Sequence, residues 1–168
     1  MNWRIGSAYR KRAREMNKAA FHEIVKQGPA PGLLAFDGEV AAGWCQLTPR
    51  DNLPWLDRQW RLRRVDDLPV WSISCCYVRK GHRRCGVTSV LITAAVKAAQ
   101  AAGAPAVEAY ALDAHQTGSS SWTGYASTFE RAGFKTVARQ VPARPIMRLD
   151  LRPVPTPAPK IVKQKKAQ

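Results

Sequence analysis

The sequence predicts one domain of the α/β class, in which helices pack against a mixed sheet. The chain has 168 residues, of which 45% are hydrophobic and 23% are charged, a composition typical of a soluble globular domain. A chain near this length buries roughly 68–70% of its unfolded surface, so it needs no disulfide framework to be stable. Segments with helical and with strand-like patterns also interleave along residues 1–151, which favours a mixed sheet over an all-helical or all-strand fold.

The N-terminal part is predicted to form a helix followed by a β-hairpin. Apolar residues recur at helical spacing over Ser7–Gln27, and Gly28 with the following proline ends the helix. Two strand candidates follow, Leu33–Phe36 and Val40–Leu47. They are joined by Asp37-Gly38, a strong signal for a tight hairpin turn.

The middle of the chain predicts a buried strand, a basic loop and a helix. Residues Thr48–Leu68 are expected to form an irregular basic connector. Val70–Val78 is rich in β-branched and aromatic residues and is expected to be a central strand. The polar loop Arg79–Cys85 then leads into a helix over Gly86–Ala102. The apolar stripe expected to face the core comprises Val87, Val90, Leu91, Ala94, Ala95, Ala98 and Ala102.

The C-terminal part completes the sheet. The expected elements are a strand at Ala106–Leu112, a loop at Asp113–Gly124, a helix at Tyr125–Ala132, and strands at Phe134–Gln140 and Ile146–Leu151. Residues 152–168 are rich in proline and lysine and are expected to be disordered, because they have almost nothing to bury.

Positive charge dominates the chain. Lysine and arginine number 27 against 12 acidic residues, which gives a formal net charge of +15. Such a field attracts any polyanion, whether nucleic acid, an anionic surface or a phosphate-rich cofactor, and it does not choose between them. Residues 87–103 form the longest nearly apolar run, which is too short and too polar to span a bilayer.

The four cysteines predict neither a metal site nor disulfides. Cys45, Cys75, Cys76 and Cys85 contain no C-x-x-C pair, and the adjacent Cys75 and Cys76 are expected to point to opposite faces of a strand. A reducing, cytoplasmic location fits this pattern best.

The stretch around Arg79–Thr88 carries the clearest chemistry. A strand leads through a basic loop into a helix, and the first N–H groups of a helix have no intrahelical acceptor, so they can bind an anion. The absence of a side chain at Gly86 lets a phosphate come close to the backbone. The spacing differs from the Walker and dinucleotide patterns, and a solvated basic turn is the alternative interpretation.

Three segments resemble the GNAT superfamily of N-acetyltransferases. Cys76–Ala95 resembles motif A of that family, whose signature [Q/R]-x-x-G-x-[G/A] is matched at Arg83 and Gly86, whereas Thr88 departs from it. Phe129–Phe134 resembles the segment on the last helix of the fold, and the hairpin at residues 32–47 resembles its second and third strands. Together these segments cover residues 32–151 in the order that the family has.

The resemblance implies a mostly antiparallel sheet with splayed central strands, in a domain at residues 1–151 that lacks the usual first strand. Acetyl-CoA would bind where Ile73–Val78 parts from Val107–Leu112. Main-chain groups of Cys76, Tyr77 and Val78 would bond the pantetheine arm. Backbone N–H groups would hold the pyrophosphate, and they belong to Arg83, Arg84, Cys85, Gly86, Val87 and Thr88. A primary amine would then attack the thioester directly, with a base to take its proton and an acid to protonate the thiolate.

The acid and the base are not fixed by the resemblance. Many members of the family have a tyrosine acid at the position of Phe129, which cannot donate a proton. Tyr125, Tyr110 and Ser121 are candidate acids, unless the thiolate leaves unaided. Glu108 is a candidate base in mid-strand, and its alternative role is a salt bridge with the basic surface.

Other residues offer weaker hypotheses. Asp113 and His115 are expected to be loop residues, and an acyl-cysteine route through Cys75 or Cys76 is less favoured than a packing role. The basic surface favours an acceptor carried on an acidic or polyanionic body. The alternatives are a nucleic-acid-binding protein and a domain that binds CoA without turnover. The resemblance is also compatible with a homodimer.

Overall fold

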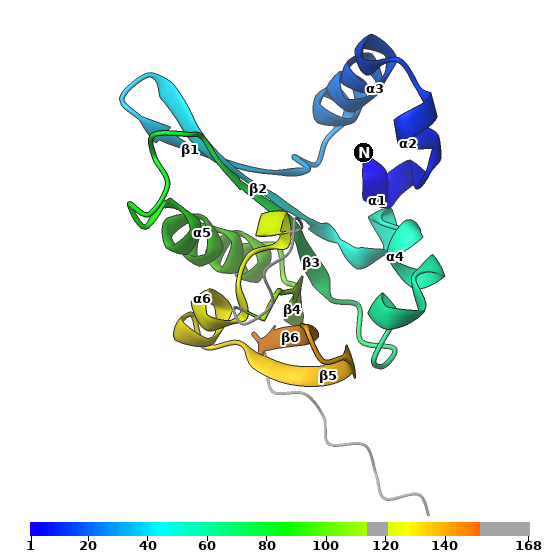
Figure 1. The fold of residues 1–168 in the computed structure, drawn as a ribbon, viewed down its shortest axis with the longest axis vertical. Coiled ribbons are helices and arrows are strands. Elements are labelled where there is room, and N and C mark those ends of the chain that lie inside the picture. Colours follow the sequence, from blue (N-terminus) through cyan, green and yellow to red (C-terminus); the bar gives the residue numbers. More distant parts are fainter. Residues whose placement is uncertain (114–120, 152–168) are drawn as a thin grey trace, which may run out of the picture.

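The computed structural model describes residues 1–113 and 121–151 (Figure 1). Six strands form one sheet in the order β1-β2-β3-β4-β6-β5, and among these neighbours β3 and β4 alone run parallel. This arrangement confirms the mixed, mostly antiparallel sheet predicted from the sequence. The strands are β1 (Gly32–Asp37), β2 (Val40–Pro49), β3 (Trp71–Val78), β4 (Ala106–Tyr110), β5 (Lys135–Val141) and β6 (Arg144–Asp150).

Helices lie on both faces of the sheet (Figure 1). One face carries α5 (Val87–Ala101) and α6 (Ala126–Arg131). The other side carries the N-terminal helices α1 (Asn2–Ile5), α2 (Ala8–Lys11) and α3 (Arg14–Gln27), together with α4 (Trp55–Arg58). Residues 1–31 contain α1, α2 and α3 and no strand, so the sheet begins with the β1–β2 hairpin.

The single helix predicted over Ser7–Gln27 is wrong, because the chain turns between Lys11 and Arg14. Arg12 is extended, with φ −83° and ψ 143°, and a second helix begins two residues later. The side chain of Asn17 explains the break. Its Nδ2 donates to the Tyr9 carbonyl oxygen at 3.0 Å, and this oxygen would accept the N–H of Ala13 in a continuous helix.

The main core lies between the sheet and α5. The residues that α5 buries there differ in part from the apolar stripe predicted for this helix. The buried residues of α5 are Leu91, Ile92, Ala95 and Ala99, whereas Val90 is 64% exposed. The helix sits close to β2 because Gly43 lacks a side chain. A Cβ at Gly43 would lie 2.8 Å from Val87 Cγ1 and 3.0 Å from Leu91 Cδ1.

The connector predicted to be irregular contains three short helical segments. These are η1 (Arg50–Asn52), α4 and η2 (Trp60–Leu62), and they cover the face of the sheet opposite α5. Their buried leucines form a second, smaller core with Tyr110 and Ile146. The sequence did not indicate this because the leucines follow no helical or strand period.

A β-bulge in β3 creates the feature that positions the site. Gln46 pairs with Cys75, but the next residue, Leu47, pairs with Ile73, so Ser74 is the extra residue. The parallel pairing of β3 with β4 covers three residues and ends at Ile73, opposite Ala109. Beyond this point β3 and β4 part, as the resemblance implied.

Candidate acetyl-CoA site

The loop between β3 and α5 is shaped to expose the first N–H groups of α5. Gly81, Arg84 and Gly86 have positive φ values of 99°, 65° and 77°. A left-handed conformation is unfavourable for a residue with a side chain and costs of order 1–3 kcal/mol. The backbone at Arg84 is therefore strained. The first intrahelical hydrogen bond runs from the N–H of Val90 to the carbonyl of Gly86. The N–H groups of residues 87–89 therefore have no intrahelical acceptor.

A cavity of about 520 Å³, here called the α5 cavity, lies beside this loop. One wall consists of six residues that the sequence assigned to the cofactor, namely Cys76, Tyr77, Val78, Arg83, Arg84 and Thr88. The other wall comes from Trp122 on η3 (Ser121–Thr123), Thr128 on α6, and Gly124 and Tyr125 in the link between these elements. The end of β3 and the start of α5 therefore line the same cavity.

An adjoining cavity of about 250 Å³, here called the loop cavity, continues along the start of α5. Gly86 and Val87 line it, together with Val78, Arg84 and Thr88, which the two cavities share. Eight of the nine predicted cofactor residues therefore line one of the two cavities or both. Cys85 does not, and its side chain is exposed on the loop.

The electrostatics of both cavities fit a phosphate group. No aspartate or glutamate is among their lining residues, all of which lie within the described ranges. The loop cavity also has Arg131 on its far wall, across from Arg84 on the loop. Guanidinium groups and free helix N–H groups are the donors that bind phosphate oxygens best. The residues present therefore fit the pyrophosphate of a CoA molecule.

Residues on the far wall were missing from the sequence-based site. Thr128 and Arg131 lie one turn apart on α6, and Trp122 precedes that helix. No spacing rule links them to the basic loop, because the fold alone brings α6 beside α5. Trp122 also contacts Trp3 of α1, with ring centroids 5.8 Å apart.

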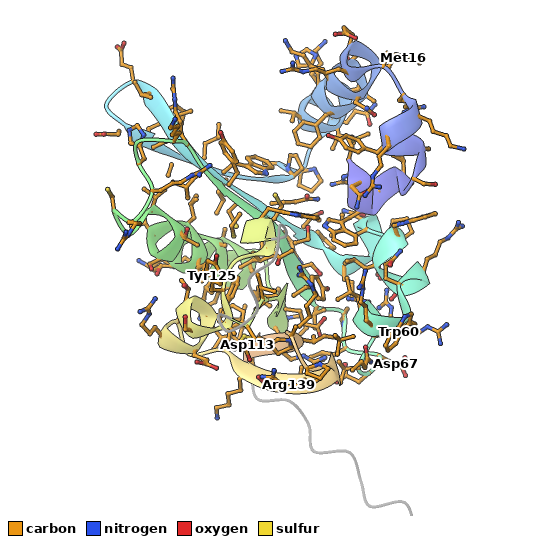
Figure 2. The ribbon with its side chains drawn as sticks, in the orientation of Figure 1. Met16, Trp60, Asp67, Asp113, Tyr125 and Arg139 are labelled. Carbon is orange, nitrogen blue, oxygen red and sulfur yellow. The ribbon has the colours of Figure 1, made fainter. Side chains whose placement is uncertain are left out.

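Tyr125, labelled in Figure 2, is the predicted acid that lines the α5 cavity. Its side chain is 43% exposed. It precedes α6 as the N-cap residue, one helical turn before Phe129. Phe129 is fully buried in the core against Phe134, with ring centroids 5.2 Å apart. The position at which the family has a tyrosine acid is therefore a packing position here.

Glu108 and Tyr110 lie elsewhere, in a buried polar cluster on the face opposite α5. Arg148 donates to Glu108 Oε1 from Nη2 at 2.7 Å and from Nε at 3.1 Å. Arg50 Nη1 lies 3.6 Å from Glu108 Oε2 and donates to the Tyr110 hydroxyl at 2.5 Å. Burial raises the pKa of Tyr110 well above its usual value. Neither Glu108 nor Tyr110 lines the α5 cavity or the loop cavity.

The remaining predicted residues are placed as follows. Asp113 forms an ion pair with Arg139 at 3.2 Å. Ser121 begins η3, and its side chain lies outside the described part, as does all of His115. The four cysteines are free thiols. Within residues 1–113 and 121–151, no three histidine, cysteine or acidic residues gather as a metal site would require.

Cys75 and Cys76 point to opposite faces of the sheet, as the sequence predicted. Cys76 lines the α5 cavity, whereas Cys75 lines a cavity of about 740 Å³ on the other face, here called the N-terminal cavity. Burial raises the pKa of the Cys75 thiol to about 11.

Among the described helices, none combines the length and apolar character that a bilayer span requires.

Comparisons with known proteins agree with this geometry. The fold resembles that of yncA from Salmonella typhimurium, described as an acetyltransferase and solved with its cofactor acetyl-CoA, with a TM-score of 0.57 and 18% identity over 86% of this chain and 78% of that one. An N-acetyltransferase from Staphylococcus aureus Mu50 gives a TM-score of 0.56 and 17% identity over 83% and 79% of the two chains. At these identities the likeness concerns the fold alone.

No curated protein matches the sequence. The family described as Acetyltransferase (GNAT) matches residues 1–134, which is most of the chain. Acetyl-CoA is the cosubstrate of this family, and the cavities beside α5 have the residues to hold it. The chain therefore belongs to the GNAT family of acetyltransferases.

Proposed function

We propose that the protein is an N-acetyltransferase that transfers the acetyl group of acetyl-CoA directly to a primary amine. One observation carries this proposal: two features lie together at the C-terminal end of β3. Arginines line the cavities at the start of α5, and β3 separates from β4 beyond Ile73. The start of α5 suits the pyrophosphate of CoA. The separation of the strands leaves main-chain groups of β3 free to form hydrogen bonds with the pantetheine arm.

The acceptor would reach the thioester from the N-terminal cavity. Cys75 lines that cavity and Cys76 lines the α5 cavity, so consecutive residues of β3 line the two spaces from opposite faces of the sheet. In the transfer, the amine nitrogen forms a bond to the thioester carbonyl carbon and the carbon–sulfur bond breaks. The sulfur leaves as a thiolate, and the amine loses one proton.

Tyr125 is the residue we assign as the acid that protonates the thiolate. Its side chain lines the α5 cavity with Cys76 and Tyr77 and is partly exposed, whereas Tyr110 is enclosed in the buried cluster. Glu108 is held by Arg148 and Arg50, which makes it a structural anion in this proposal rather than the base. Water in the N-terminal cavity could accept the proton of the amine.

Calorimetry of acetyl-CoA binding to two matched variants tests the site. Thr88→Asp places a negative charge in the first turn of α5, where it stabilises a helix by about 0.3–1 kcal/mol but repels pyrophosphate. We expect the variant to remain folded and to bind acetyl-CoA at least about tenfold more weakly, a difference of about 1.4 kcal/mol. Thr93→Asp, an exposed position farther along the same helix, should bind as the wild type does.

Equal affinity of Thr88→Asp and Thr93→Asp for acetyl-CoA would overturn the proposal. Transfer itself is then measured as the release of free CoA thiol in the presence of primary amines. Tight binding without thiol release for any amine would instead support the alternative of a CoA-binding domain without turnover.

A further inference from the structure

The N-terminal cavity has a strongly positive lining. Arg10 and Arg12 from the end of α2, with Arg14 and Lys18 from α3, line it, and no acidic residue does. None of these four cations forms an ion pair with a carboxylate among the residues that the structure describes. All four are exposed, in contrast to the buried Arg50, which is paired with Asp57.

The start of α3 adds further donors at the same place. Its N-cap residue, Ala13, offers no side-chain cap, and the first intrahelical hydrogen bond is donated by Asn17. The N–H groups of residues 14–16 therefore have no intrahelical acceptor at the positive end of a 14-residue helix. Asn17 itself lines the cavity and is 8% exposed. Its buried Oδ1 has no hydrogen-bond partner within the described part, and as an acceptor it can take an N–H group of a ligand but not an anionic oxygen.

The lining also includes the aromatic residues Tyr9, Phe21 and Trp44, and it extends to the proposed reaction point. Phe21 and Trp44 meet edge to face, with ring centroids 6.0 Å apart. Gln46 and Cys75 line the cavity on β2 and β3, beside the bulge at which the sheet opens. A volume of about 740 Å³ falls within the roughly 300–1,000 Å³ typical of sites for small molecules.

We propose that this cavity selects a small primary amine that carries a carboxylate or a phosphate group. The proposal rests on the N-acetyltransferase function proposed above and names the class of its acceptor. The anionic group would lie among Arg12, Arg14 and the free N–H groups of α3, with the amine directed toward Cys75 at the opening of the sheet. Both ends lie in one cavity, so a single small molecule can span it. A cationic polyamine would be repelled by the same lining.

The test compares matched acceptors at low ionic strength, with CoA thiol release as the readout. 2-Aminoethyl phosphate is paired with ethanolamine, and 4-aminobutanoate with its methyl ester, so that the two anionic groups are tested separately. We expect kcat/KM to be at least about tenfold higher for the anionic member of one pair or both, which corresponds to a few exposed charge interactions. Spermidine should be the poorest acceptor.

A double charge reversal identifies the cations responsible. Arg12→Glu with Arg14→Glu should abolish the preference by raising KM for the anionic acceptor far more than KM for the neutral acceptor, since the charge interaction is made by the anionic acceptor alone. Lys97→Glu with Lys135→Glu alters the net charge equally at exposed positions outside the cavity, and the preference should persist. Acetyl-CoA binding, measured by calorimetry, should be the same in both double variants.

Three results overturn the inference. The first is equal turnover of anionic and neutral amines, and the second is an equal loss of preference in the control variant. The third is a preference for lysine in an acidic peptide, or for an RNA-linked amine, over every small acceptor. If acetyl-CoA binds and amines are acetylated regardless of charge, only this inference fails. If acetyl-CoA does not bind at all, the proposed function fails with it.

Discussion

Glu108 and Arg148 face each other across the pairing of β4 with β6 and form a buried ion pair, with 2.7 Å between Glu108 Oε1 and Arg148 Nη2. Their side chains are 2% and 8% exposed. A carboxylate in this position is held by guanidinium groups on two sides, because Arg50 approaches its other oxygen. The pair joins β4 to β6 on the face that the short helices of the connector cover.

We expect Glu108→Gln to destabilise the fold rather than to block chemistry directly. Removing one partner of a buried ion pair costs about 3–5 kcal/mol when the other charge is left uncompensated. We expect a smaller loss here, because Arg148 keeps its ion pair with Asp66 and Arg50 keeps its ion pair with Asp57. Urea denaturation measures the loss, with the exposed Glu130→Gln as the matched control. If Glu108 were the catalytic base, the variant would keep its free energy of unfolding and lose turnover.

Asp66 should make the stability depend on pH at the acidic end. Hydrogen bonds from Arg148, at 2.6 and 2.9 Å, lower the pKa of Asp66 below its usual value. The resulting stabilisation is complete above the unfolded pKa of about 3.9 and is lost as the pH falls through the lower folded pKa.

The free energy of unfolding of the wild type should therefore exceed that of Asp66→Asn by a constant amount above about pH 5, and the difference should shrink below about pH 4. Urea denaturation between pH 3 and pH 7 measures it. Asp67→Asn, at the exposed neighbouring position, is the matched control for the loss of one carboxylate. A difference in the free energy of unfolding between the wild type and Asp66→Asn that stays constant down to pH 3 would contradict the prediction.

Cys75 should be unreactive and dispensable. With a pKa of about 11, only about one thousandth of this thiol is ionised at pH 8, and the thiolate is the nucleophile. We expect iodoacetamide to modify the exposed Cys85 first, as measured by mass spectrometry of the peptides. Cys75→Ser should keep kcat within about twofold, since direct attack by the amine needs no acyl-cysteine. An acetyl group trapped on Cys75 would refute this prediction.

Tyr125→Phe should lower kcat while leaving the binding of acetyl-CoA unchanged. The variant keeps the ring that lines the α5 cavity and removes the hydroxyl group. Loss of a general acid typically costs 10²–10⁴-fold, and a thiolate is a tolerable leaving group, so we expect a decrease of about 100-fold. Steady-state kinetics and calorimetry measure the two quantities. A variant with unchanged kcat would mean that the thiolate leaves unaided.

Gly6 should be needed to seat the N-terminal helices. Its φ is +60°, and an added Cβ would lie 2.1 Å from Trp55 Cε2. Gly6→Ala should detach α1 from α4 and with it Trp3, whose Nε1 donates to the Ser74 carbonyl at 3.2 Å. We expect the positive φ alone to cost about 1–3 kcal/mol and the clash to add to it.

Gly38→Ala provides the matched control, because Gly38 also has a positive φ, of 56°, but nothing lies within 4 Å of its added Cβ. Chemical denaturation should show a larger loss of stability for Gly6→Ala. KM for the acceptor should rise in that variant, while the Kd for acetyl-CoA stays the same. Equal effects of the two substitutions on stability and on KM would show that the contact with Trp55 is unimportant.

The parts of the site that local sequence determines could be predicted. The β3–loop–α5 segment is such a part, since a β-branched strand, glycines at turning points and a helix stripe lie within one short stretch. The hairpin at Gly38 was predicted for the same reason. Asn17 shows the limit, because one side-chain hydrogen bond to Tyr9 breaks a helix whose apolar spacing is continuous.

Residues that depend on tertiary packing could not be predicted. Arg131 joins the loop cavity only because α6 lies beside α5. The enclosure of Glu108 depends on Arg50 and Arg148, which are 58 and 40 residues away in the sequence. Charge composition likewise gave the sign of the field, but only the fold gathers Arg12 and Arg14 at the N-terminal cavity.

The placement of Cys75 and Cys76 on opposite faces of β3 has a consequence for the order of events during turnover. Because Cys75 and Cys76 belong to different faces of the sheet, the proposed donor and acceptor have separate entrances. Neither substrate has to leave before the other enters, so both can be present at once and initial-rate plots should intersect. The acetylated product and CoA can likewise depart by different routes, and a slow exit of one does not obstruct the other.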